Sequence, residues 1–131
     1  MTNKELMELA IKARKNSYCK YSGFAVGAAL LTKSGKVYLG CNVENASFTP
    51  TSCAERTAIL SAIAAGEREF SAIAVCGGKQ GKARATCTPC GVCRQVMSEF
   101  CDKDFPILLE GENSNIIEIT LGELLPFAFD M

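Results

Sequence analysis

The 131-residue chain contains no histidine. Without histidine, neither a Ser-His-Asp triad nor a Cys-His pair can form. A catalytic metal then has to be held by cysteine and carboxylate side chains, and the general acid or base has to be another residue type. The absence of histidine therefore leaves cysteine and carboxylate side chains as the candidates for metal binding, and a residue other than histidine as the candidate for proton transfer.

The chain also lacks net charge, because 14 basic residues balance 14 acidic ones. A broad electropositive face for nucleic acid is therefore not expected. No apolar run is long enough to span a membrane. The first six residues, Met-Thr-Asn-Lys-Glu-Leu, are charged and unlike a signal peptide. We expect a cytoplasmic protein that binds a small, weakly charged ligand and neither nucleic acid nor membrane.

Eight cysteines are present, and in a reducing compartment clustered thiols indicate a metal site or catalysis more often than disulfides. The length and the 48% hydrophobic content suit one domain over residues 1–131. Periodicity and turn signals predict helices at 4–17, 53–65 and 89–101, strands at 24–32, 36–43, 70–77, 106–110 and 116–120, and a last helical turn at 120–125.

Helices that alternate with buried strands after an initial hairpin predict an α/β layered fold with a mixed sheet. In such a fold the two central helices begin at the carboxyl ends of their preceding strands. Their first residues, near Cys53 and Cys90, are then expected at one edge of the sheet, where ligands of open α/β folds bind.

The segment Pro89-Cys90-Gly91-Val92-Cys93 is the first candidate site. Two thiols at this spacing can bind one metal ion about 2.3 Å from each sulfur. Thr88 as N-cap and Pro89 as first helical residue predict a helix whose positive end stabilises the thiolates. A redox dithiol and two unlinked reduced cysteines are the alternatives.

Cys53 supplies a third thiolate if the two helix starts are neighbours. Three protein ligands leave the fourth position open, as in catalytic zinc sites, and Glu55 can then move protons without binding the metal. Other interpretations stay open: Ser52-x-x-Glu55 matches a capping box, Cys53 alone can be a small buried hydrophobe, and Cys87 can close a structural site as fourth thiolate.

Cys-Ala-Glu at one helix start and Pro-Cys-x-x-Cys at the next match the zinc deaminase signature, with cysteine as the first ligand. With the segments 21–30, 42–46, 53–58 and 89–96 and Leu124-Leu125-Pro126, nearly the whole chain resembles the small homotetrameric cytidine deaminases of pyrimidine salvage. The resemblance implies a three-layer α/β/α fold with a mixed five-stranded sheet.

It also implies zinc-dependent hydrolytic deamination of cytidine and deoxycytidine to uridine and deoxyuridine plus ammonia. One Zn²⁺ per chain would be held by Cys53, Cys90 and Cys93, and hydroxide formed from zinc-bound water would attack C4. Glu55 would shuttle the protons. Arg56 would donate hydrogen bonds to the cysteine sulfurs. The alternative interpretation is that Arg56 is a solvent-facing helix residue.

For the nucleoside, the resemblance places Asn42 and Glu44 on the ribose hydroxyls, Phe24 against the nucleoside and the backbone near Cys53 and Ala54 on the pyrimidine. Without it, Asn42 and Glu44 merely end a strand and open a turn, and Phe24 is a core residue. Phe129 would cover the base from a neighbouring subunit, so that active sites are completed within a homotetramer.

Two other functions are considered. The first is a related deaminase that acts on a nucleoside such as blasticidin S. The segment 42–46 argues against this function, because such an enzyme could change the residues that bind ribose. A non-enzymatic module would use its zinc structurally, with Cys87 as fourth ligand. The basic segment 79–84 is expected to be a solvated surface.

Overall fold

The computed structural model describes residues 1–131 and contains one five-stranded sheet in the order β2-β1-β3-β4-β5. The sheet is formed by β1 Phe24–Thr32, β2 Val37–Cys41, β3 Phe70–Lys79, β4 Pro106–Glu110 and β5 Ile116–Thr120. The α-helices are α1 Asn3–Arg14, α2 Ala54–Ala64, α3 Gly91–Phe100 and α4 Leu121–Leu124, and a short 3₁₀ helix, η1, covers Glu112–Ser114. No helix has the length and apolar character that a membrane crossing requires.

The sheet is mixed. β1 pairs antiparallel with both β2 and β3, β3 pairs parallel with β4, and β4 pairs antiparallel with β5. The predicted mixed five-stranded sheet and the initial hairpin are therefore confirmed. The predicted ranges 24–32, 106–110 and 116–120 coincide with the observed strands.

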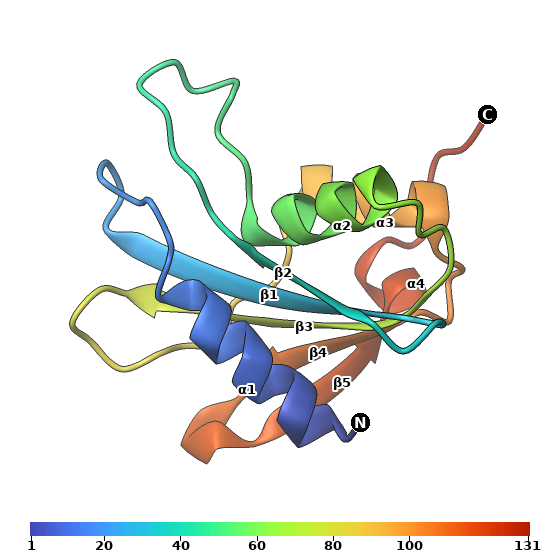
Figure 1. The fold of residues 1–131 in the computed structure, drawn as a ribbon, viewed down its shortest axis with the longest axis horizontal. Coiled ribbons are helices and arrows are strands. Elements are labelled where there is room, and N and C mark those ends of the chain that lie inside the picture. The colour runs from blue at the N-terminus through green and yellow to red at the C-terminus, as the bar shows by residue number, and fades with distance from the viewer.

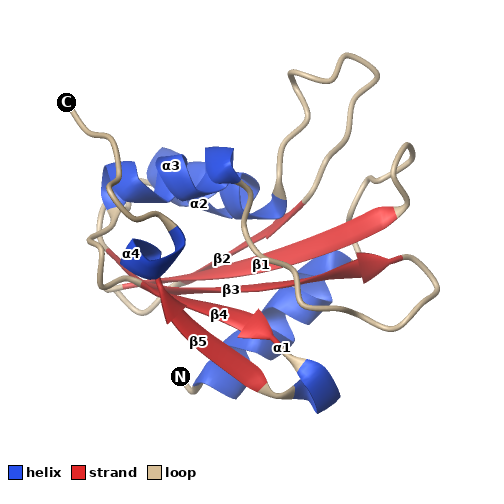
Figure 2. Ribbon diagram, turned by 180° about the vertical axis from the view of Figure 1, so that it is seen from behind, coloured by secondary structure: helices blue, strands red, loops and turns tan.

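Helices cover both faces of the sheet (Figures 1 and 2). On one face, Leu6, Met7 and Ala10 of α1 pack against small and apolar strand residues such as Ala74 and Leu108. On the other, α2, α3 and Leu121 of α4 enclose a larger core. The predicted three-layer α/β/α fold is confirmed.

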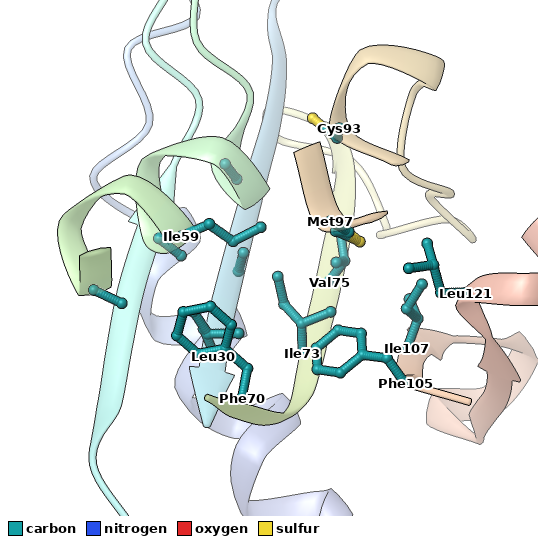
Figure 3. Close-up of a cluster of buried hydrophobic side chains, with 14 of the residues drawn as sticks. Leu30, Ile59, Phe70, Ile73, Val75, Cys93, Met97, Phe105, Ile107 and Leu121 are labelled. Carbon is teal, nitrogen blue, oxygen red and sulfur yellow. The ribbon is translucent and has the colours of Figure 1, made fainter. Parts of the chain in front are cut away.

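The larger core extends from Phe70 and Phe105 to the start of α3. Cys93 lies at one end of this cluster, above Met97 and Val75 (Figure 3). Since Cys93 is fully buried, the first turn of α3 is fixed by the same packing that holds the sheet and helices together. One candidate ligand is thus attached directly to the hydrophobic core.

The helix starts differ from the predicted ones in detail. The N-cap of α3 is Cys90 in an extended conformation, so Thr88 and Pro89 lie in the preceding loop and do not begin the helix. The Ser52-x-x-Glu55 capping box does not form, because Cys53 is the N-cap of α2 and the Ser52 hydroxyl lies 3.0 Å from the Thr57 hydroxyl instead. A capping box does form between Thr120 and Glu123 at α4.

Candidate active site and metal centre

Three cysteine sulfurs come together where α2 and α3 begin. Cys53 is the N-cap of α2, Cys90 is the N-cap of α3, and Cys93 lies in the first turn of α3. The Sγ of Cys90 is 3.7 Å from that of Cys53 and 3.6 Å from that of Cys93, and all three sulfurs lie within 4.8 Å of one another. The expected meeting of the two helix starts is confirmed.

The surroundings of Cys53 stabilise negative charge on its sulfur. Hydrogen bonding with the Cys93 thiol, the Arg56 guanidinium and the Cys90 thiol lowers the pKa of Cys53 to about 5 despite partial burial. Arg56 Nη2 lies 3.3 Å from this sulfur. The Cys93 pKa is raised because its thiol donates to Cys53 and is buried. The Cys53 sulfur is therefore stabilised as a thiolate.

Glu55 follows Cys53 by two residues, lies in the first turn of α2 and is only 4% exposed. It borders a cavity of about 210 Å³ together with Cys53 and Cys90. Burial raises its pKa from 4.5 to about 7. A carboxyl group with this pKa exchanges a proton readily near neutral pH, which suits a general acid and base.

The same cavity is lined by the residues predicted to hold a nucleoside: Phe24, Asn42, Glu44 and Ala54. The Asn42 amide is fixed from both ends, since its Nδ2 donates to the Phe24 carbonyl at 2.8 Å and its Oδ1 accepts from the Val26 N–H at 2.9 Å. The Ser17 hydroxyl donates to the same oxygen.

Glu44 is held by the turn that precedes β1. Its carboxylate accepts hydrogen bonds from the backbone N–H groups of Tyr21 and Ser22 and from the Ser22 hydroxyl. The side-chain and backbone hydrogen bonds from Ser22 lower the pKa of Glu44. Ser22 and Ser17 could not be predicted as the partners of Glu44 and Asn42, because such loop positions carry no periodic signal.

Phe129 lies away from the cavity, and Cys87 lies outside the three-sulfur group. Phe129 is 68% exposed and does not border the cavity of its own chain, while its carbonyl accepts a hydrogen bond from Gln95. Cys87 does line the cavity, but it is not part of the three-sulfur group. Burial raises the pKa of the Cys87 thiol to about 12, which favours the protonated form.

The donor set fits zinc. Thiolates are ligands that Zn²⁺ prefers, and three of them at one point leave a fourth coordination position for water or substrate. Three thiolates bring excess negative charge, which the Arg56 guanidinium beside Cys53 partly offsets. The site therefore has both the ligands and the charge balance that a zinc ion needs.

Comparison with known proteins leads to the same site. The family model described as the cytidine and deoxycytidylate deaminase zinc-binding region matches residues 1–109. The chain belongs to this family. A cytidine deaminase from Sporosarcina psychrophila is 44% identical over 98% of this chain and 92% of its own length.

Solved structures agree with this assignment. The crystal structure of a cytidine deaminase from Burkholderia pseudomallei superimposes with a TM-score of 0.90 and 48% identity, covering 98% of this chain and 100% of that one. A blasticidin-S deaminase from Bacillus cereus is 31% identical over 79% of this chain and 76% of its own. Zinc is the family's metal, and the group Cys53, Cys90 and Cys93 fits one ion per chain.

Proposed function

We propose that this deaminase-family chain catalyses the zinc-dependent hydrolysis of cytidine and deoxycytidine to uridine and deoxyuridine, with release of ammonia. The observation that carries the proposal is a buried carboxyl group, Glu55, facing a cavity beside three clustered cysteine sulfurs. When bound by Cys53, Cys90 and Cys93, zinc acidifies water and so provides a nucleophile at neutral pH.

Glu55 carries the protons in this proposal. Its carboxylate takes a proton from the attacking water and delivers it to N3 of the pyrimidine. It then takes the remaining proton from the hydroxyl group added at C4 and gives it to the amino group, which leaves as ammonia while the C4 carbonyl forms, so that one water is consumed and one ammonia released. Burial supports both roles, because a pKa near 7 gives appreciable amounts of acid and base at neutral pH.

The other cavity residues position the nucleoside. Glu44 and Asn42 accept and donate hydrogen bonds at the ribose, Phe24 packs against the nucleoside, and the backbone near Ala54 contacts the base. Fixed side chains support this assignment, since the hydrogen bonds of Asn42 and Glu44 orient them before substrate arrives. Arg56 holds the Cys53 thiolate.

The proposal includes a homotetramer in which Phe129 of one subunit covers the base in another. Its support is that Phe129 is exposed and away from the cavity of its own chain. We further propose one domain over residues 1–131, supported by a single sheet, and a cytoplasmic location, supported by eight cysteines that are all free.

The alternatives have less support. The blasticidin-S deaminase relative is less similar and covers less of the chain than the cytidine deaminase relative. A structural zinc closed by Cys87 is disfavoured because Cys87 lies outside the sulfur group.

The test follows the ultraviolet absorbance of cytidine incubated with zinc-loaded protein. We expect turnover by the wild type, and a loss of about 10²–10⁴-fold in Glu55→Gln, because that variant cannot take up or deliver the proton. Zinc content is measured on both proteins. Absence of turnover of cytidine and deoxycytidine by a folded wild type with one zinc per chain would refute the proposal.

A further inference from the structure

The contact between α2 and the sheet is unusually close at Gly40 of β2. A Cβ atom placed on Gly40 would lie 2.2 Å from the carbonyl oxygen of Ala54 and 2.5 Å from the backbone nitrogen of Ala58. The obstructing atoms belong to the backbone, so no side-chain rotation can relieve the overlap. The helix therefore lies at a height above β2 that only glycine permits.

The surrounding residues are small as well. Gly40 pairs with Ala28 of β1, and Ala28, Ala54 and Ala58 are all fully buried in the same core cluster. With methyl groups as the largest side chains in this contact, the backbone of α2 approaches the strands closely. Dense packing at this point makes the position of the helix sensitive to a single added carbon.

The part of α2 that rests on Gly40 is the part that carries the chemistry. Ala54 stands between the ligand Cys53 and the carboxyl group of Glu55. Cys90 and Cys93 belong to α3, which follows a different strand, β3. The 3.7 Å between the sulfurs of Cys53 and Cys90 is thus a distance between two separately placed helices.

We propose that Gly40 is a positioning residue, which sets the height of the α2 amino terminus and thereby the placement of Cys53 and Glu55 relative to the thiols of α3. This inference rests on the metal site of the proposed function and adds a residue that touches neither metal nor substrate. A shift of α2 relative to α3 changes the geometry of the three sulfurs, because Cys53 lies at the start of α2 whereas Cys90 and Cys93 lie at the start of α3.

The opposite face of the sheet provides a matched control. A Cβ on Gly27 of β1 would lie 2.1 Å from the carbonyl oxygen of Ala10 and 2.5 Å from the backbone nitrogen of Arg14, in α1. The steric conflict is therefore nearly the same as at Gly40. However, α1 carries no residue of the sulfur cluster or of the cavity.

The experiment compares Gly40→Ala with Gly27→Ala by zinc competition with a chelator and by cytidine turnover, both per folded chain. In Gly40→Ala, α2 has to move by about 1 Å, and we expect turnover to fall about 10²-fold. The zinc dissociation constant is expected to rise about 10–100-fold, as for changes next to metal ligands. Gly27→Ala should lower stability and leave both quantities unchanged.

A second pair of variants keeps the test valid if the added carbon prevents folding. Ala58→Gly thins the contact with Gly40 without creating a clash, whereas Ala62→Gly makes the same change one turn further from the site, at an equally buried alanine. We expect weaker zinc binding in Ala58→Gly only.

The outcomes separate the two proposals. Equal zinc affinities within each matched pair, or equal losses, would refute the role of Gly40. A wild-type protein that binds one zinc but does not turn over cytidine would refute the proposed function, while the zinc affinities of the variants would still decide about Gly40.

Discussion

Arg56 Nη2 lies 3.3 Å from the sulfur of Cys53 and donates a hydrogen bond to it, so a residue of the first turn of α2 stabilises the thiolate at the helix N-cap. The same Nη2 lies 3.4 Å from the Thr51 carbonyl oxygen, which fixes the guanidinium on the loop before the helix. Part of the negative charge that three thiolates bring to a metal is thus offset by a residue of the same helix turn.

Replacing Arg56 by glutamine is expected to weaken zinc binding about 10–100-fold, because the Cys53 thiolate loses a charged hydrogen-bond donor. The pKa of Cys53 is expected to rise in this variant, because the guanidinium no longer stabilises the thiolate. As the pH falls, protonation of Cys53 should therefore begin to weaken zinc binding at a higher pH than in the wild type. Chelator competition across a pH series measures the shift. Arg68→Gln, which changes an arginine that donates only to the Ile63 and Glu67 carbonyls, is the control. Equal zinc affinities in the two variants would contradict the role of Arg56.

Glu55 is expected to destabilise the metal-free protein at neutral and higher pH. Its pKa is raised from 4.5 to about 7 by burial, so between these values the folded state binds more protons than the unfolded state. Stability then falls as the pH rises through this window, by at most about 3 kcal/mol for such a shift.

Urea unfolding of metal-free wild type and Glu55→Gln at pH 5 and pH 8 tests this. The glutamine variant should gain stability relative to wild type as the pH rises, while it loses turnover when loaded with zinc. A difference in unfolding free energy that is the same at both pH values would show that the Glu55 carboxyl group is not desolvated.

The ion pair between Arg84 and Glu110 anchors the loop that leads to the metal ligands of α3. Arg84 Nε lies 2.8 Å from Oε1 of Glu110 and Nη2 lies 3.0 Å from Oε2, and Glu110 is 5% exposed. Arg84→Ala leaves a buried carboxylate without its partner. We expect a loss of about 3 kcal/mol, at the low end for a buried pair because the Arg84 side chain is 33% exposed.

Thermal unfolding measures this loss, and the double variant Arg84→Met with Glu110→Leu is the comparison. Apolar residues of similar size remove both charges together, so the double variant should be more stable than Arg84→Ala alone. If the two unfold at the same temperature, the unpaired carboxylate is not the cause of the destabilisation.

The sequence predicted most of the sheet because apolar runs bounded by turn residues are a local signal, as at Phe24–Thr32. The metal ligands were predictable from motif spacing. Arg84 was assigned to solvent because its partner Glu110 is 26 residues away, and no periodic pattern reveals such a pair. The Ser52-x-x-Glu55 pattern was misleading because α2 begins one residue later than a capping box requires, with Cys53 and not Ser52 as its N-cap.

Ser22 is expected to affect binding of the ribose without affecting chemistry. Its hydroxyl and its N–H both donate to Glu44, which the proposal places on the ribose. Ser22→Ala leaves the backbone donors in place but frees one carboxylate oxygen. We expect a higher KM for cytidine with kcat unchanged, measured by steady-state kinetics. A fall in kcat at constant KM would instead connect Ser22 to the chemical step.

Phe129 provides a test of sites shared between subunits. Its backbone carbonyl accepts a hydrogen bond from Gln95 at 3.1 Å and the residue is largely exposed, which is consistent with a contact to another subunit in the proposed homotetramer. Phe129→Ala should raise KM for cytidine, and Glu55→Gln should abolish turnover. When the two variants are unfolded together and refolded as mixed oligomers, some sites combine an intact Glu55 with a Phe129 ring donated by the other chain. The mixture should therefore bind cytidine more tightly than the Phe129→Ala homo-oligomer. If mixed oligomers form by native mass spectrometry but KM stays at the value of Phe129→Ala, the ring acts within its own chain or not at all.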